Sequence, residues 1–184
     1  MTYYAKVNTD IRHALFTDLI LENHPAFYEG SSLSLSLKTN PAFFNMEHII
    51  ESMMAICSNG LYEFNDGVHQ DYTDESDCKT GTLYINEGSS TTAGEISSVR
   101  SRDGVLKKGA IRAVIINPIL KKNHFFFIPK TAVKDLMTKK NGEQKKTKSI
   151  CLRYNKTTNE FSTIDKYGII EYNTFKELAM EKNR

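Results

Sequence analysis

The chain has 184 residues, of which 40% are hydrophobic and 25% charged, a balance typical of a globular protein that is long enough for a core of its own. No apolar run approaches the length of a membrane span, and the N-terminus lacks the basic and then apolar order of a signal peptide. We therefore expect a cytoplasmic protein without membrane contact. The three cysteines, Cys57, Cys78 and Cys151, predict reduced thiols, and no spacing of cysteines and histidines suggests a zinc site.

Charge is unevenly distributed along the chain. Residues 1–99 contain 4 Lys and Arg against 14 Asp and Glu, whereas residues 100–184 contain 20 against 8. An acidic part can hold a cation and a basic part can hold a polyanion, which is the combination that a phosphate-cutting protein needs. The alternative is that the two halves intermix in space and that the charges only cover solvated faces.

The first third of the chain predicts two helices and a strand. Apolar residues recur at helical spacing over residues 9–23. The leucines in residues 33–37 alternate with serines, which predicts a short strand. An Asn-Pro pair favours a helix start at Pro41, and this second helix is expected to reach about Cys57. Its predicted core face comprises Met46, Ile49, Ile50, Met53 and Ile56.

The rest of the chain predicts mainly strands. They are expected at residues 61–64, 68–72, 77–85, 109–117, 124–129, 149–154 and 160–165, with further helices at 131–140 and 172–180. The Gly, Ser and Thr content of residues 87–98 predicts a mobile loop. This order indicates an α/β protein with one domain over residues 1–184, a core of about 41–140 and a small C-terminal addition at 149–184.

The most informative segment is Asp71-Tyr-Thr-Asp-Glu-Ser-Asp77-Cys-Lys79, which contains four acids and one lysine and leads into a predicted strand. Strand side chains alternate between faces, so Asp77 and Lys79 are expected on the same face. Asp71 lies six positions upstream and can reach the same place across a turn. Two carboxylates beside an ammonium can hold a divalent metal and activate a water, which is the chemistry of metal-dependent phosphodiester cleavage.

The order of predicted elements resembles that of the PD-(D/E)XK nuclease superfamily, the fold of many restriction enzymes. This order is a helix with a glutamate, a hairpin, an acid, a short turn and an acid-x-lysine strand. The spacing of Asp71-Tyr72 from Asp77-Cys78-Lys79-Thr80 is most similar to the branch that contains the mismatch-repair nicking endonuclease. The resemblance covers roughly residues 41–130, and it departs from the family at Gln70, where a proline is usual. It implies a restriction-endonuclease-like core with a central mixed β-sheet flanked by helices.

The resemblance also implies a role for each residue of the motif. Asp71 and Asp77 would bind Mg²⁺, for which Mn²⁺ can substitute, together with the backbone carbonyl of Cys78 and several waters. Lys79 would orient the attacking water and offset charge in the transition state. Glu51, on the preceding helix, would complete the metal site.

Other residues compete for these roles. Glu47 lies one helical turn from Glu51 and is the alternative helix ligand. Asp66 and Asp74 are alternative first acids, although Asp74 falls within the expected turn. Glu143-Gln-Lys145 also matches acid-x-lysine, but no strand follows it. Calcium binding in an EF-hand loop is excluded, because the aspartates are three residues apart instead of two.

Basic residues around the predicted loop indicate a DNA contact, because phosphate contacts favour Lys and Arg on exposed loops. They are Arg100, Arg102, Lys107 and Lys108, with Arg112 in the following strand, where it could equally pair with an acid. The sequence thus predicts a Mg²⁺-dependent DNA endonuclease of restriction, repair or phage DNA-degradation type, which as a homodimer would cut both strands. The alternative is a non-catalytic nucleic-acid-binding or regulatory protein that uses the basic C-terminal half.

Overall fold

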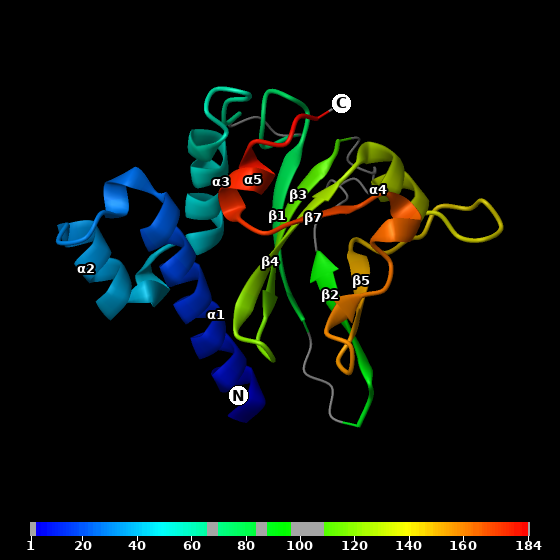
Figure 1. The fold of residues 1–184 in the computed structure, drawn as a ribbon, viewed down its shortest axis with the longest axis horizontal. Helices are drawn as coiled ribbons and strands as arrows, with labels where there is room; N and C mark the ends of the chain where they lie inside the picture. Colours follow the sequence, from blue (N-terminus) through cyan, green and yellow to red (C-terminus); the bar gives the residue numbers. More distant parts are fainter. Residues whose placement is uncertain (1–2, 66–69, 84–87, 97–108, 184) are drawn as a thin grey trace.

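Seven strands form one mixed β-sheet in the part of the chain that the computed structural model describes, residues 3–65, 70–83, 88–96 and 109–183. The strands are β1 (Asp77–Leu83), β2 (Thr91–Ile96), β3 (Ile111–Asn117), β4 (Lys122–Ile128), β5 (Ile150–Asn155), β6 (Glu160–Phe161) and β7 (Ile170–Tyr172). Their order across the curled sheet is β6-β5-β2-β1-β3-β4-β7 (Figure 1). Only the β1–β3 pairing is parallel among these strands, and the predicted α/β class with a mixed sheet is confirmed.

Five α-helices accompany this sheet within the described residues. They are α1 (Tyr3–Asn23), α2 (Ser32–Thr39), α3 (Met46–Cys57), α4 (Lys130–Leu136) and α5 (Phe175–Ala179), and short 3-10 turns lie at Pro25–Phe27, Pro41–Phe43 and Asp165–Tyr167. None of the helices in these ranges combines the length and the apolar character needed to cross a bilayer.

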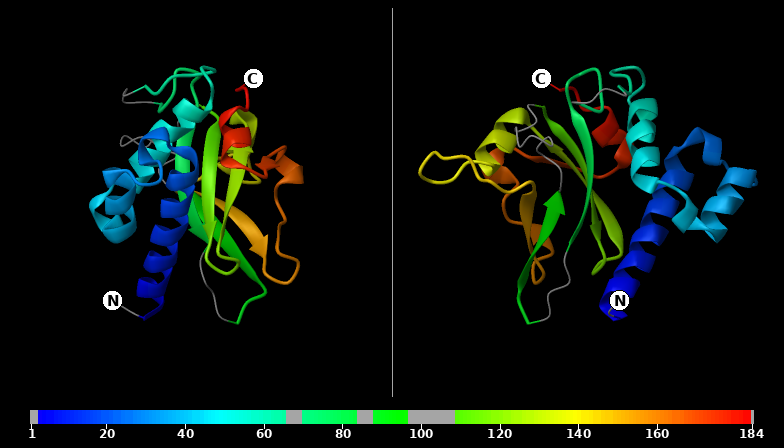
Figure 2. Two further views of the ribbon diagram at one scale, coloured as in Figure 1. Left: turned by 60° about the vertical axis from the view of Figure 1, so that its left-hand side comes forward. Right: turned by 180° about the vertical axis from the view of Figure 1, so that it is seen from behind.

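The helices divide the core between the two faces of the sheet. Helices α1, α3 and α5 pack against one face and α4 against the other (Figure 2). Strand β3 is buried on both faces, and its side chains alternate as strand geometry requires. Val114 and Ile116 belong to the core under α1 and α3, whereas Ala113 and Ile115 belong to the core under α4.

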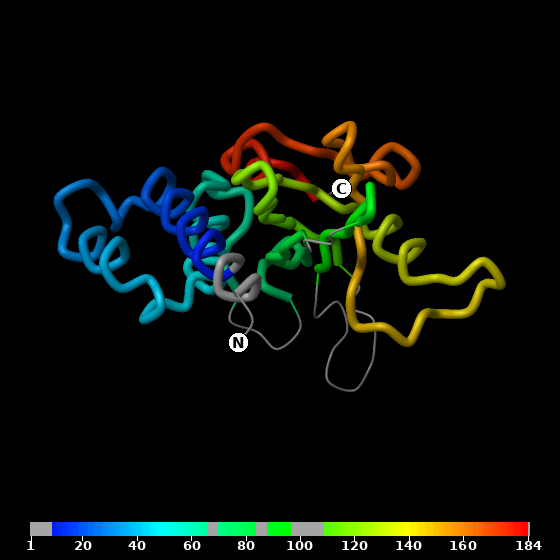
Figure 3. Tube along the Cα trace, turned by 90° about the horizontal axis from the view of Figure 1, so that it is seen from below, coloured from blue at the N-terminus to red at the C-terminus, as the bar shows by residue number. Residues whose placement is uncertain are grey.

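The acidic and basic halves of the sequence interleave in this sheet. Strands β1 and β2 come from the acidic half, and they lie between β5 and β3 of the basic half. Residues after 149 supply β5, β6 and β7 at the two edges of the sheet as well as α5, so they are integral to it. The basic loop between α4 and β5 projects at the opposite end of the molecule from α1 and α2 (Figure 3).

The strand predicted at residues 33–37 is wrong, because these residues belong to α2. Ser31 caps this helix by accepting a hydrogen bond from the Ser34 backbone N–H at 3.1 Å. Ser31, Ser34 and Leu37 are buried at a spacing of three, while Leu33 and Leu35 are exposed. The burial period is therefore helical, although the leucines by themselves alternate.

Helix α3 begins five residues later than predicted. Residues Pro41–Phe43 form a separate 3-10 turn, and Asn45 caps α3 by accepting from the His48 N–H. Met54 of this helix is fully buried in the protein core, whereas Ile56, which was predicted to face the core, is half exposed.

The loop predicted at residues 87–98 is also wrong, because Thr91–Ile96 forms β2 between β1 and β5. Glycine in this part of the sequence marks close packing between strands. A Cβ on Gly81 would lie 2.3 Å from the backbone oxygen of Glu95, and a Cβ on Gly94 would lie 3.0 Å from the side chain of Ile115. These contacts join residues that are far apart in the sequence, so local composition does not reveal them.

We predict that Gly81→Ala destabilises the protein by about 2–3 kcal/mol, because the new methyl group meets a backbone carbonyl that cannot move away alone. Gly94→Ala is the matched control and should cost less, since its nearest neighbour is a side-chain methyl group of Ile115 at 3.0 Å instead of a backbone oxygen at 2.3 Å. Urea denaturation of the two variants measures the difference. Equal losses of stability would show that β1 and β2 are not packed at this distance.

Candidate active site

The candidate site lies where the chain enters the central strand β1 after a tight turn. The Tyr72 N–H donates to the Ser76 carbonyl at 3.2 Å, and the Glu75 N–H donates to the Tyr72 carbonyl at 3.1 Å. The Asp77 N–H then donates to the carbonyl of Ala110 at 2.9 Å, beside β3. Asp71 and Asp77 therefore flank a turn that backbone hydrogen bonds hold together.

Two hydrogen bonds fix the two aspartates against each other. The Asp71 N–H donates to Asp77 Oδ1 at 3.1 Å, and the Cys78 N–H donates to Asp71 Oδ2 at 2.9 Å. Each carboxylate thus accepts from the backbone of the other side of the turn. The predicted reach of Asp71 across a turn is confirmed, and these two hydrogen bonds orient both side chains.

Lys79 lies between these carboxylates, as the alternation of strand side chains predicts. Its Nζ is 3.2 Å from Asp71 Oδ2, 3.7 Å from Asp77 Oδ2 and 2.9 Å from the carbonyl oxygen of Cys78. Burial alone would lower the pKa of Lys79, but the negative charges of Asp77 and Asp71 outweigh it and raise the pKa above its ordinary value. Lys79 is consequently held protonated.

Glu51 lies on α3, within electrostatic range of Asp71 and Lys79. The Tyr72 hydroxyl donates to the backbone carbonyl of Glu51 at 2.8 Å and so joins α3 to the turn. Burial raises the pKa of the Glu51 carboxyl, and the charge of Asp71 raises it further, while Lys79 and His48 act in the opposite direction. Glu51 is therefore electrostatically part of the site.

The alternative helix residue, Glu47, points elsewhere. Its carboxylate pairs with Arg12 of α1, whereas His48 Nδ1 lies 3.5 Å from the Glu51 carboxylate. The geometry favours Glu51 as the helix residue of the site.

The donors around Lys79 are two carboxylates and one backbone carbonyl. Among the described residues, no group of three or more His, Cys, Asp or Glu side chains lies close enough together to hold a metal ion by itself. Mg²⁺ commonly binds through one or two carboxylates and keeps several waters, so Asp71, Asp77 and the Cys78 carbonyl are a donor set of the right chemistry. All three already contact a single cationic group, the Lys79 ammonium.

Arg112 is not a DNA contact, and this prediction requires correction. Its side chain is fully buried, and its guanidinium lies 4.0 Å from the ring centroid of Tyr62. It donates to Asp74 Oδ2 at 2.9 Å, to the Ser76 hydroxyl and to the Glu181 carbonyl at 2.6 Å. A charged side chain with these internal partners is not exposed to a phosphate backbone.

The same contacts give Asp74 a structural role. Asp74 Oδ1 accepts from the Ser76 N–H and hydroxyl, and the Asp74 carbonyl accepts from Asn183 Nδ2 at 2.6 Å. Asp74 is thus committed to holding the turn and does not serve as the first acid. The other alternative first acid, Asp66, lies outside the described residues.

The remaining predicted DNA contacts, Arg100, Arg102, Lys107 and Lys108, also lie outside the described residues. His124, for which the sequence assigns no role, is buried between Asn117 and Glu171, with its Nδ1 at 2.7 Å from Glu171 Oε1. Tyr72 and Ser76 were missed as supports of the site. The sequence signal for the buried contacts of Arg112 was an arginine inside an otherwise apolar strand, because a charge in such a position needs a buried partner.

Scans against protein-family models, curated proteins and solved structures return no match for this chain.

We predict that Asp74→Ala destabilises the protein by about 3 kcal/mol, because it leaves the fully buried Arg112 guanidinium without its carboxylate. The double variant Asp74→Ala with Arg112→Met should lose less stability than the sum of the two single variants, since the pair is in direct contact. Glu143→Ala, which removes the exposed pair with Lys139, is the control and should leave the unfolding midpoint unchanged. Additive effects of the Asp74 and Arg112 changes would contradict the coupling.

Proposed function

We propose that this protein is a metal-dependent endonuclease that hydrolyses phosphodiester bonds in DNA with Mg²⁺. One observation carries the proposal: Glu51 of α3, Asp71 before the turn, and Asp77 and Lys79 of β1 interact at one place. These residue types, in this order along the chain, are those of the PD-(D/E)XK nucleases. We also propose a restriction-endonuclease-like core, which the position of β1 between antiparallel β2 and parallel β3 supports.

The oxygens of Asp71, Asp77 and the Cys78 carbonyl would hold the metal ion. When bound, Mg²⁺ polarises a phosphate and lowers the pKa of a coordinated water. The donor set fits this ion because all its atoms are oxygens and because two carboxylates leave positions for water. We further propose a cytoplasmic location, which three free cysteines favour.

The protein side chains have complementary tasks. Lys79, whose pKa is raised by Asp77 and Asp71 against the effect of burial, stays protonated and so stabilises negative charge instead of accepting a proton. Glu51 has a raised pKa through burial and Asp71, which makes its carboxylate a better proton acceptor than an ordinary glutamate. The Tyr72 hydroxyl holds the backbone of Glu51 beside the turn and thereby sets the distance between α3 and the turn.

We predict that purified protein cuts supercoiled plasmid with Mg²⁺ or Mn²⁺ and not with EDTA. Asp77→Asn keeps an oxygen for the Asp71 N–H but removes the charge, and Lys79→Ala removes the ammonium; each should lower the cleavage rate by about 100-fold or more. Lys145→Ala is the matched control, because Glu143-Gln-Lys145 is the other acid-x-lysine match and lies in a loop outside the site.

Two outcomes would remove the proposal. Cleavage that survives both substitutions would place the reaction elsewhere or in a contaminant. DNA binding without cutting in any metal would favour the non-catalytic binding protein instead.

We also predict opposite effects of Lys79→Met on metal binding and on cleavage. The ammonium contacts the same oxygens as the proposed metal, so its removal should tighten Mn²⁺ binding roughly tenfold while cleavage is lost. Calorimetric titration with Mn²⁺ and the Mn²⁺-dependent rise in unfolding temperature measure the first effect without activity. Absence of Mn²⁺ binding in both proteins would mean that the carboxylates and Lys79 form only a structural ion pair.

A further inference from the structure

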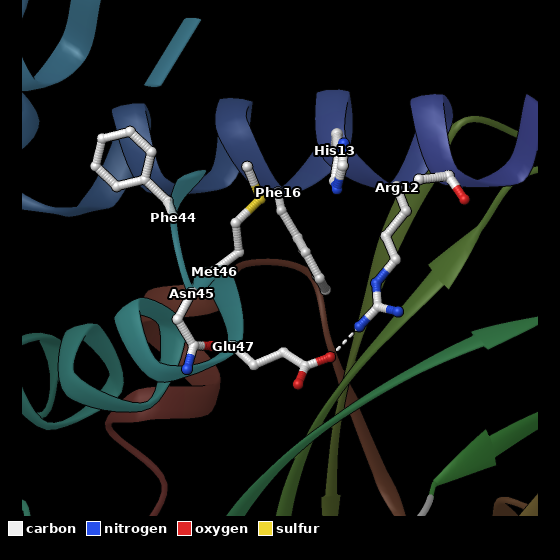
Figure 4. A pocket seen from close by; sticks show the side chains of 8 residues that line it. Arg12, His13, Phe16, Phe44, Asn45, Met46 and Glu47 are labelled. Atoms are coloured by element: carbon white, nitrogen blue, oxygen red, sulfur yellow. Dashed lines mark hydrogen bonds and ion pairs between the residues drawn. The ribbon is translucent and has the colours of Figure 1, made fainter. Parts of the chain in front are cut away.

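A pocket of about 250 Å³ lies between α1 and the beginning of α3. Its lining combines aromatic rings with polar side chains from both helices (Figure 4). Its lining includes Arg12, His13 and Phe16 of α1, Phe44 just before α3, and Met46 and Glu47 in the first turn of α3. The pocket is smaller than the roughly 300–1,000 Å³ of typical small-molecule sites, so it suits a single base-sized group.

The polar and apolar parts of this pocket match the two parts of a nucleotide. Phe16 is almost fully buried and provides a fixed apolar wall, while Phe44 is partly exposed and lies with its ring centroid 6.0 Å from that of Phe27. Such rings give a base a stacking surface. Arg12, whose side chain is 37% exposed, provides a cation at the same pocket.

The pocket adjoins the candidate active site along α3. Glu47 lines the pocket, and Glu51 lies four residues further along the same helix face, about 6 Å of axial rise. The backbone carbonyl of Glu51 accepts a hydrogen bond from the Tyr72 hydroxyl at 2.8 Å, and Tyr72 directly follows Asp71 in the chain. A DNA strand whose scissile phosphate lies at Lys79 can therefore place a neighbouring nucleotide in this pocket.

We infer that the pocket between α1 and α3 binds one unpaired nucleotide of the substrate strand, next to the phosphate that is cut, with its base against Phe44 and its phosphate near Arg12. This inference rests on the proposed nuclease function and adds to it that the substrate strand is single-stranded or locally opened at this nucleotide, because the pocket is too small for a base pair. It assigns substrate binding to α1, which lies outside the segment that resembles the nucleases.

The ion pair between Arg12 and Glu47 makes the inference testable in two directions. Figure 4 shows the two side chains pointing toward one another between α1 and α3. A phosphate at Arg12 competes with the Glu47 carboxylate, so loss of the arginine and loss of the glutamate charge must act oppositely. A pair that only supports the fold would give losses in the same direction.

The experiment measures binding of a labelled single-stranded oligothymidylate in EDTA, over a series of salt concentrations, by fluorescence anisotropy. Arg12→Ala should weaken binding roughly five- to tenfold and reduce the slope of log affinity against log salt by about 0.7, the value for one phosphate contact on a single strand. Glu47→Gln should strengthen binding about two- to fivefold. Lys38→Ala, a change of an exposed cation on α2 outside this pocket, is the control and should leave the affinity unchanged.

The base contact is tested with Phe44→Leu, which keeps an apolar side chain beside Phe27 but removes the ring. It should weaken binding roughly fivefold without changing the salt slope. An oligonucleotide with an abasic site moved along its length should bind the wild-type protein worst at one position, and Phe44→Leu should abolish this position dependence. Circular dichroism and the unfolding temperature of each variant establish that it is folded.

The outcomes separate this inference from the proposed function. An unchanged affinity in Arg12→Ala, parallel losses in Arg12→Ala and Glu47→Gln, or no binding of single strands overturns the inference, even if the protein cuts plasmid. Opposite effects of the two changes together with a position-dependent abasic effect support it, and they do so in EDTA, where cleavage plays no part. If that pattern appears in a protein that cuts no DNA with any metal, the pocket stands and the proposed nuclease function fails.

Discussion

The buried guanidinium of Arg112 is the interaction on which the candidate site depends. It lies in the apolar core between the tyrosine rings and the sheet, where an unpaired charge would be strongly unfavourable. Its charge is balanced by Asp74, and its remaining contacts reach Ser76 and the backbone of Glu181. The turn between Asp71 and Asp77 therefore cannot change shape without exposing or unpairing this cation. The contacts of Arg112 with Asp74 and Ser76 in this way help to fix the separation of the two aspartates.

The acidic segment of residues 71–77 is shared between two cations on neighbouring parallel strands, the partly buried Lys79 and the fully buried Arg112. Asp71 and Asp77 face Lys79 on β1, while Asp74 faces Arg112 on β3, the residue directly opposite Cys78 in the sheet register. Asp74 thus has a structural role, whereas Asp71 and Asp77 lie beside Lys79 at the candidate site. This division accounts for three of the four acids of the segment, and it leaves only Asp71 and Asp77 beside the proposed metal site.

The sequence was sufficient to predict those features of the structure that local patterns determine. Strand alternation placed Asp77 and Lys79 on one face, and the short spacing placed Asp71 across a turn from them. The predictions failed where distant contacts decide. Residues 33–37 alternate in hydrophobicity yet form α2, and Thr91–Ile96 has the composition of a loop but is paired on both sides by β1 and β5. The role of Arg112 needed the positions of Asp74 and Glu181, which are 38 and 69 residues away.

The contacts made near the C-terminus also bear on how the protein is synthesised. Glu181 accepts from Arg112, and Asn183 donates to the carbonyl of Asp74, a residue 109 positions earlier. A ribosome makes Asp71, Asp77 and Lys79 long before it makes these two partners. A nascent chain can therefore form β1 and its neighbours, but the turn gains its full support only after residue 183 has emerged. Assembly of the site is therefore completed only after Asn183 is made, 109 positions after Asp74, which separates the synthesis of the charged residues from the formation of the geometry they require.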